Sequence, residues 1–227
     1  MTISKHIHSC LLVEDQNKTI LIDPGNYSYD AKALDVNTLK QLDAIVITHE
    51  HPDHMYIPWI KEIIQKFPNT PIFTTNNAKQ LLEQENIENI NTKGNEFISL
   101  EPVPHEKIWM GKAPENVMAT LFGKFVTPGD SHSFNLNRHP EHSEGSHEVV
   151  DQVSNDVILA LPVQAPWGST TRAVELALEL KPKIIIPIHD WHWRDEARKS
   201  FYQRLKEYFA QNGIDFKAVE TGEIMEV

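Results

Sequence analysis

Among its 227 residues the chain has a single cysteine, Cys10. One thiol cannot form an internal disulfide, and it excludes a zinc site built from several cysteines. The chain also lacks any apolar run near the roughly 20 residues that a membrane-spanning helix needs. In the first 15 residues a histidine interrupts the apolar stretch, and Glu14 and Asp15 soon follow, so this segment does not resemble a signal peptide. These absences predict a soluble, cytoplasmic protein.

Basic side chains are scarce relative to acidic ones. Lys and Arg number 21 and Asp and Glu number 32, which gives a formal net charge of −11. Because general binding of nucleic acids depends on cationic side chains that neutralise phosphates, this balance disfavours a polyanion-binding protein. We therefore expect a small-molecule substrate, with neither a nucleic acid nor a membrane as partner. The sequence is compatible with a homo-oligomer.

Short apolar runs alternate with helical patterns along the whole chain. Strands are predicted at residues 3–14, 19–23, 43–48, 71–75, 97–102, 119–127, 156–163 and 183–188, with a terminal strand pair around 216–219 and 224–227. Helices are predicted at residues 57–67, 77–85, 170–180 and 194–211. Buried strands with interleaved helices predict a layered α/β fold in a single domain, residues 1–227. The polar residues 131–148 are expected to form a surface loop or flap.

The strongest chemical signal is His49-Glu50-His51-Pro52-Asp53-His54, which directly follows the predicted strand at residues 43–48. Three imidazoles and the Asp53 carboxylate within six residues suit a divalent cation such as zinc or manganese. A loop at the carboxyl end of a strand lets these side chains converge, whereas a continuous helix or strand would splay them. The segment therefore predicts a metal centre.

This cluster resembles the signature of the metallo-β-lactamase superfamily. Other segments resemble further elements of that superfamily: the Asp23-Pro24-Gly25 turn, the isolated His105, Gly129-Asp130-Ser131, and Pro187-Ile188-His189. Residues 8–12, His-Ser-Cys-Leu-Leu, are similar to the opening strand of the metal-dependent hydrolases related to ascorbate-phosphate lactonase. The resemblance implies a four-layer αβ/βα sandwich with two pseudo-equivalent halves, about residues 1–115 and 116–227.

The same resemblance implies a dinuclear metal site. His49, His51 and His105 would hold one metal. Asp53, His54 and His189 would hold the other, and Asp130 would bridge the two. Two divalent ions, Zn²⁺ first with Mn²⁺ or Fe²⁺ as alternatives, would lower the pKa of a bridging water and make a hydroxide nucleophile. We expect Asp53 and Asp130 to have catalytic roles, and Asp53 to orient the hydroxide or accept its proton.

Four more residues are candidates for supporting the metals or contacting the substrate: His8, Asp23, His132 and His192. Asp23 either caps its turn or supports the metal loop, and His8 is either a polar strand residue or a pocket residue. Three histidines in the polar segment are expected to be exposed to solvent: His139, His142 and His147. Three tryptophans either form a pocket wall or pack in the core: Trp167, Trp191 and Trp193.

The functional prediction is a metal-dependent hydrolase acting on a small polar or anionic ester-type substrate, namely a lactone, an ester or a phosphodiester. The alternatives are a nuclease or tRNA-processing-like phosphodiesterase, and a non-catalytic metal-binding member of the fold. The acidic net charge disfavours the nuclease, and a non-catalytic member would be expected to have lost ligands. A redox di-iron protein of the same superfamily is a further alternative, which His51 disfavours, because the motif of that branch resembles His-x-Glu-x-Asp-His, with glutamate at this position.

Overall fold

The computed structural model describes residues 1–108, 111–134 and 156–227. Its strands are β1 (Thr2–Lys5), β2 (Leu11–Asp15), β3 (Lys18–Ile22), β4 (Ala44–Val46), β5 (Ile72–Phe73), β6 (Ile90–Asn91), β7 (Ile98–Pro102), β8 (Val117–Leu121), β9 (Phe125–Thr127), β10 (Ile158–Pro162), β11 (Ile184–Ile188), β12 (Asp215–Phe216) and β13 (Ile224–Glu226). Its helices are α1 (Asn26–Asp30), α2 (Ile57–Lys66), α3 (Asn76–Gln84), α4 (Thr170–Leu180) and α5 (Asp195–Gln211), with a 3₁₀ turn at Val36–Thr38.

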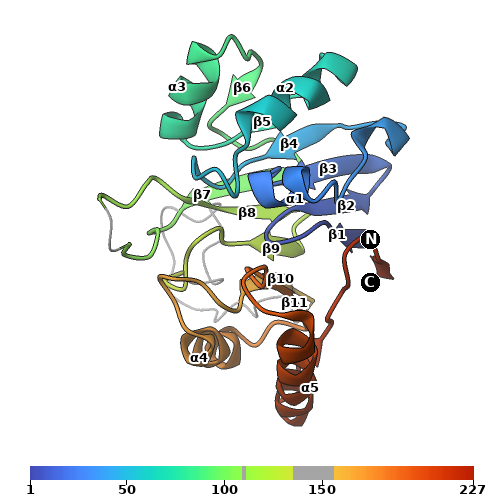
Figure 1. The fold of residues 1–227 in the computed structure, drawn as a ribbon, viewed down its shortest axis with the longest axis vertical. Helices are drawn as coiled ribbons and strands as arrows, with labels where there is room; N and C mark the ends of the chain where they lie inside the picture. Colours follow the sequence, from blue (N-terminus) through green and yellow to red (C-terminus); the bar gives the residue numbers. More distant parts are fainter. Residues whose placement is uncertain (109–110, 135–155) are drawn as a thin grey trace, which may run out of the picture.

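Two sheets pack face to face, and helices cover their outer faces (Figure 1). One sheet has seven strands in the order β13-β1-β2-β3-β4-β5-β6, and the other has six in the order β12-β11-β10-β9-β8-β7. Side chains from both sheets, such as Ile22 and Ile186, form one buried cluster between them. The cluster around Ile60 joins α2 and α3 to the first sheet, and that around Phe209 joins α4 and α5 to the second. The predicted four-layer sandwich is therefore confirmed.

Burial on both faces explains the sequence of the central strands. Every residue of β4, β10 and β11 is buried, and these strands consist almost entirely of aliphatic side chains. Two helices begin at capping side chains: the Thr75 hydroxyl accepts a hydrogen bond from the Ala78 amide at the start of α3, and the Ser169 hydroxyl accepts one from the Arg172 amide at the start of α4. Local capping and apolar patterning thus agree with the layers.

Strand direction brings the loops of the candidate site to one edge of the sandwich. β3 and β4 are parallel in the first sheet, and β9 and β11 both run parallel to β10 in the second. The carboxyl ends of these strands lead directly into Asp23, the 49–54 loop, Asp130 and His189. A hydrogen bond from the Val117 amide to the Thr48 carbonyl, at 3.1 Å, joins the two sheets at this edge.

The prediction of one strand over residues 3–14 is wrong. The chain forms β1 and β2, an antiparallel pair, and residues 6–10 make the turn between them. Ile7 and His8 have left-handed backbone conformations, with φ of 70° and 57°, and the His6 amide bonds the Cys10 carbonyl at 2.8 Å. Left-handed conformations are unfavourable for such side chains, so local sequence gives little signal of this turn.

The single strand predicted over residues 119–127 is also two strands. β8 and β9 form a hairpin that turns at Phe122 and Gly123, both with positive φ. The apolar run continues through the turn because Phe122 packs into the buried cluster between the sheets. Hydrophobic pattern alone therefore merges the two strands.

The last two strands do not pair with each other as predicted. β12 pairs with β11 in the six-stranded sheet, whereas β13 pairs with β1 in the seven-stranded sheet. β6 was not predicted, since a strand of two residues leaves almost no periodic signal. Most of the predicted flap, including His139, His142 and His147, lies outside the described residues. The two pseudo-equivalent halves stay a prediction.

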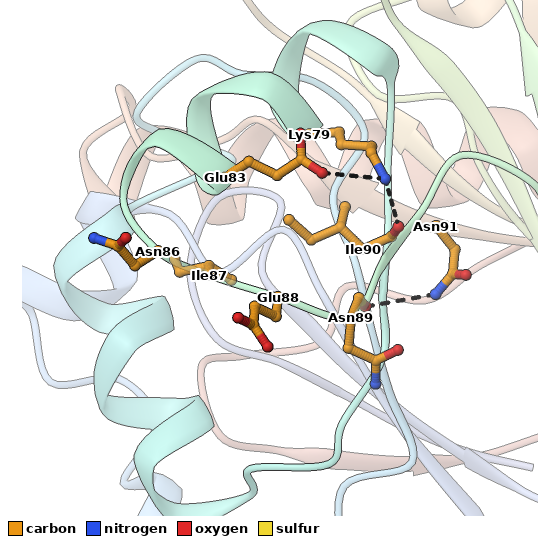
Figure 2. A pocket seen from close by; sticks show the side chains of 8 residues that line it. All are labelled: Lys79, Glu83, Asn86, Ile87, Glu88, Asn89, Ile90 and Asn91. Carbon is orange, nitrogen blue, oxygen red and sulfur yellow. Dashed lines mark hydrogen bonds and ion pairs between the residues drawn. The ribbon is translucent and has the colours of Figure 1, made fainter.

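Within the described ranges, no helix is both long and apolar enough to cross a membrane. A hollow of about 480 Å³ lies between the end of α3 and β6 (Figure 2). The Lys79 side chain lines this hollow, and its ammonium group lies 3.3 Å from the Glu83 carboxylate and 3.1 Å from the Ile90 carbonyl oxygen. None of the predicted metal ligands lines this hollow.

Candidate metal centre

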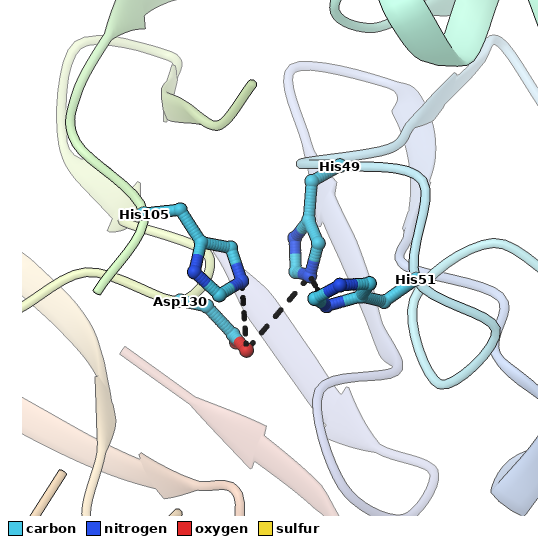
Figure 3. A group of neighbouring side chains, drawn as sticks. All are labelled: His49, His51, His105 and Asp130. Atoms are coloured by element: carbon cyan, nitrogen blue, oxygen red, sulfur yellow. Dashed lines mark hydrogen bonds and ion pairs between the residues drawn. The ribbon is translucent and has the colours of Figure 1, made fainter. Parts of the chain in front are cut away.

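A first group of ligand-type side chains consists of His49, His51, His105 and Asp130, whose donor atoms lie within 4.8 Å of one another. Figure 3 shows these imidazoles and the carboxylate turned toward one another, with His49 and His51 on one loop and His105 and Asp130 on other segments. Nε2 of His49 lies 3.0 Å from Nδ1 of His51. Oδ2 of Asp130 lies 3.8 Å from Nε2 of His49 and 3.5 Å from Nε2 of His105. The structure thus brings together three histidines predicted to share one metal.

A second group surrounds the other oxygen of Asp130. Oδ1 of Asp130 lies 2.8 Å from Nε2 of His189 and 3.1 Å from Nε2 of His54. These two ring nitrogens are 3.1 Å apart. His8 joins them, since donor atoms of His8, His54 and His189 also lie within 4.8 Å of one another. Asp53 borders this group, with Oδ2 at 3.2 Å from Nε2 of His8.

The chemistry and spacing of these donors fit two divalent cations. Ligand atoms that each lie about 2.0–2.2 Å from a zinc ion are themselves roughly 3 Å apart, as are Nε2 of His54 and Nε2 of His189. Nε2 of His105 is buried and has no hydrogen-bond partner in the part of the chain that the structure describes. A buried imidazole nitrogen that points at a carboxylate and other imidazoles is well suited to donate its lone pair to a metal.

Hydrogen bonds behind the donors fix which ring nitrogen faces the site. Nδ1 of His54 donates to Oδ2 of Asp23 at 2.8 Å, which leaves Nε2 of His54 for a metal. Oδ1 of Asp23 accepts the Thr48 amide at 2.7 Å, so the same carboxylate also holds the start of the metal loop. Nδ1 of His105 donates to the Glu106 carbonyl at 2.6 Å. Of the two roles left open for Asp23, support of the metal loop is the one its contacts favour.

The pKa values of His49 and Asp130 are shifted toward the protonation states that metal binding requires, whereas that of His54 is shifted away from it. Burial, together with the neighbouring His54, holds the pKa of His49 well below its usual value. Burial alone would raise the pKa of Asp130, but the imidazoles of His189, His54 and His49 hold it well below its usual value. Asp130 is therefore an anion and His49 is neutral at pH 7, as bound ligands would be. Burial alone would lower the pKa of His54, but the carboxylates of Asp130 and Asp23 outweigh burial and hold it well above its usual value, so a metal would displace a proton from His54.

A buried ion pair supports the loop that carries His189. The Lys5 ammonium group lies 2.7 Å from Oδ2 of Asp190 and donates to the Pro187 carbonyl at 2.8 Å. The Tyr202 hydroxyl donates to the same Asp190 oxygen at 2.8 Å. This network joins β1 to the end of β11 and was not predicted, because its partners are far apart in the sequence and have no motif.

Indole and imidazole rings border the centre on its second-sheet side. Nε1 of Trp167 donates to Oδ2 of Asp130 at 2.7 Å, a polar contact that sequence reasoning missed. His132 is buried, with Nε2 2.7 Å from the Pro162 carbonyl and its ring 5.0 Å from that of Trp167. His132 therefore supports Trp167 from behind and lies outside both donor groups.

A second group of aromatic side chains lies beside His8. Trp191 is 45% exposed and stacks on Tyr27, with ring centroids 5.9 Å apart. His192 is exposed and lies edge-on to Tyr27 at 5.9 Å. Trp193 instead packs against Phe201 and belongs to the core cluster of the second sheet. Of the three tryptophans, Trp167 and Trp191 thus border the site.

A hollow of about 420 Å³ adjoins the first group at His51. Its lining includes the side chains of Glu50, Asn77, Lys112 and Glu115. This side of the metal centre is polar and carries charges of both signs, whereas the side next to His8 is aromatic.

Close backbone packing holds the metal loop in place. Gly25 lies so near the loop that a Cβ atom there would overlap the carbonyl group of Asp53. We expect Gly25→Ala to displace the loop, to lower the free energy of unfolding by about 1–3 kcal/mol, as overpacking does, and to reduce bound metal. Denaturant unfolding and elemental analysis measure both effects. Gly213→Asn is the control, because no atom lies within 4 Å of a Cβ there and asparagine tolerates the left-handed φ of 74° better than other side chains; wild-type metal content in Gly25→Ala would contradict the prediction.

Comparison with known proteins agrees with this architecture. The model of the Metallo-beta-lactamase superfamily matches residues 4–71. Protein Rv0786c of Mycobacterium tuberculosis is 28% identical over 218 residues, covering 91% of this chain and 92% of that protein. A UPF0173 metal-dependent hydrolase of Bacillus cereus is 47% identical over 58 residues, so that match spans 24% of each chain.

Among solved structures, the metallo-β-lactamase fold protein YhfI of Bacillus subtilis superposes with a TM-score of 0.67 at 13% identity. The superposition covers 100% of this chain and 99% of YhfI, so the whole fold is shared. The segment matched by the superfamily model contains Asp23 and the 49–54 loop. The remaining members of the donor groups follow strands of that same fold. This chain therefore has the metallo-β-lactamase fold, and its residues 4–71 match the model of that superfamily.

Proposed function

We propose that the protein is a hydrolase with two divalent metal ions that acts on a small polar or anionic ester-type substrate. The observation that carries the proposal is the placement of Asp130, whose Oδ1 faces His54 and His189 while its Oδ2 faces His49 and His105. Two bound ions supply Lewis acidity for the substrate oxygen and lower the pKa of water toward neutrality. The UPF0173 relative in Bacillus cereus is named a metal-dependent hydrolase, which supports this class.

The donor set favours Zn²⁺, with Mn²⁺ and Fe²⁺ as alternatives, because imidazole and carboxylate suit all three. The residues in and beside the second group differ in how far their side chains are buried. His54 and Asp130 are almost completely buried, whereas the Asp53 side chain is 27% exposed at the mouth of the site. Asp53 is therefore the carboxylate placed to orient water and to accept its proton. Trp167, which donates to Asp130, holds that carboxylate in its bridging orientation.

The lining of the site supports a substrate with one polar and one flat end. The hollow beside His51 offers Lys112 and Asn77 to a polar or anionic group. On the opposite side, Tyr27 and Trp191 offer aromatic faces. The likeness of residues 8–12 to the lactonase-like hydrolases puts anionic lactones first among the candidates, followed by carboxylic esters and phosphodiesters.

Turnover that depends on metal is the test of this function. The protein, reconstituted with Zn²⁺ or Mn²⁺, should hydrolyse at least one member of a panel of lactones, esters and phosphodiesters. A chelator should abolish that turnover and added metal should restore it. Hydrolysis of an RNA oligomer in place of these substrates would favour the nuclease alternative. A protein that binds two metals and turns over no substrate would favour the non-catalytic alternative.

Trp191 is expected to contribute to binding and not to the chemical step. Stacking on an indole is worth about 0.5–1.5 kcal/mol, so we expect Trp191→Ala to raise KM for esters with an aromatic group by roughly three- to tenfold, with kcat nearly unchanged. Steady-state kinetics with matched aromatic and aliphatic esters measure the effect. Trp193→Phe is the control, because Trp193 packs inward. An equal rise in KM for both esters would argue against a stacking role.

A further inference from the structure

His8 lies in a position that the fold constrains from several sides. It is 1% exposed and sits in the turn between β1 and β2 with φ of 57°, next to Ile7 with φ of 70°. Two consecutive non-glycine residues in the left-handed region are uncommon, and such conformations persist where surrounding contacts enforce them. Here the His8 carbonyl accepts the His189 amide at 3.4 Å, and the Ser28 hydroxyl donates to the Ile7 carbonyl at 3.2 Å.

This constrained backbone directs the His8 ring toward the second donor group. Its ring centroid lies 4.0 Å from that of His189 and 5.6 Å from that of His54. Nε2 of His8 lies 3.2 Å from Oδ2 of Asp53, whereas Nδ1 is buried and has no hydrogen-bond partner among the described residues. Tyr27 packs edge-on against the outer side of the ring, at 5.1 Å. Among the described residues, the polar contact of the ring is therefore the carboxylate of Asp53.

Few other contacts fix the orientation of the Asp53 side chain. It lies in the 49–54 loop, and its side chain is 27% exposed, in contrast to 0% for His54 and 3% for Asp130. Within the described part of the chain, His8 is the one side chain that hydrogen-bonds its carboxylate. A ligating carboxylate generally needs such an outer partner to present a single oxygen to its metal.

We propose that His8 is a positioning residue of the metal centre: its Nε2–H group donates to Oδ2 of Asp53 and keeps the other oxygen turned toward the metal position of His54 and His189. This inference rests on the proposed function only in requiring that metal. A nitrogen that donates a hydrogen bond has no lone pair for a metal, so His8 acts through Asp53. As a ligand instead, His8 would be a fifth protein donor at that position, beside Asp53, His54, His189 and Asp130.

Replacement of His8 followed by metal titration tests the proposal. His8→Leu keeps most of the side-chain volume and removes the donor, while in His8→Gln the amide nitrogen reaches the place of Nε2. We expect His8→Leu to weaken binding of the second metal roughly 10- to 100-fold, the usual loss for an outer partner of a ligand, and to leave the first unchanged. His8→Gln should restore most of the affinity. Calorimetric titration with Zn²⁺ and the visible absorption of the Co²⁺-loaded protein give these readouts without turnover.

The matched control is His6→Gln, since His6 is also buried but bonds Ser4 and the Ala33 carbonyl. It should bind both metals as the wild type does. If His8→Leu fails to fold, His8→Asn, whose amide is too short to reach Asp53, replaces it with the same expected loss. Wild-type affinity in the variants without the donor would overturn the proposal. So would an equal loss in His8→Gln with a changed Co²⁺ spectrum, which would make His8 a ligand. A wild-type protein that binds fewer than two metals would instead overturn the dinuclear function.

Discussion

Asp130→Ala is expected to leave the folded protein with one metal ion or none and to lower kcat/KM at least about a thousandfold. Two metals provide several kcal/mol of transition-state stabilisation, and each 1.36 kcal/mol corresponds to a tenfold change in rate. Asp130 contacts both donor groups through different oxygens, so its loss affects both metal positions. Elemental analysis after reconstitution, together with kinetics on the best substrate of the panel, measures the two effects.

Asp30→Asn is a suitable control for this substitution. Asp30 is exposed at the end of α1, outside both donor groups. The Asp30→Asn substitution removes the same charge from the protein, and the variant should retain two metals and full activity. Retention of two metals by Asp130→Ala would show that this carboxylate does not bridge them.

Removal of both metals is expected to lower the unfolding temperature by about 10–20 °C. An ion present at a free concentration 100-fold above its Kd stabilises the native state by about 2.7 kcal/mol. Two ions therefore contribute about 5 kcal/mol, and 1 kcal/mol shifts the unfolding temperature of a chain of this size by about 2–4 °C. The ions would also coordinate imidazole nitrogens that lie close together inside the protein, such as those of His49 and His51.

Scanning calorimetry with and without a chelator measures this shift, and added Zn²⁺ should reverse it. The Asp130→Ala variant serves as an internal comparison, because a protein that has lost one or both ions should show half the shift or less. An identical unfolding temperature with and without chelator in the wild type would mean that the donor groups bind metal weakly or not at all.

The part of the site that sequence could predict is the part with local signals. The 49–54 loop places four predicted ligands in a short segment after a buried strand, so both its chemistry and its position can be inferred from the sequence. His105, Asp130 and His189 stand alone in the sequence, and they were predicted through resemblance to a family. The structure brings these residues together with the loop.

Contacts between distant segments could not be predicted in the same way. The bond from Trp167 to Asp130 and the role of His8 beside Asp53 depend on tertiary geometry, and neither has a motif. The turn at Ile7 and His8 was missed for a related reason. Its left-handed backbone is maintained by contacts to Ser28 and His189 and opposes the local preference of its own residues.

The Lys5–Asp190 ion pair joins segments that a cut near residue 115 would separate. A fragment of residues 1–115 would keep β1 but lose both Asp190 and the neighbouring strand β13. Its Lys5 side chain would lose its partners Asp190 and Pro187, and β1 would become an edge strand without its partner β13. The complementary fragment would carry Asp190 and an unpaired β13. We therefore expect the two fragments to be poorly folded when expressed separately and to regain structure only when they are mixed or produced together.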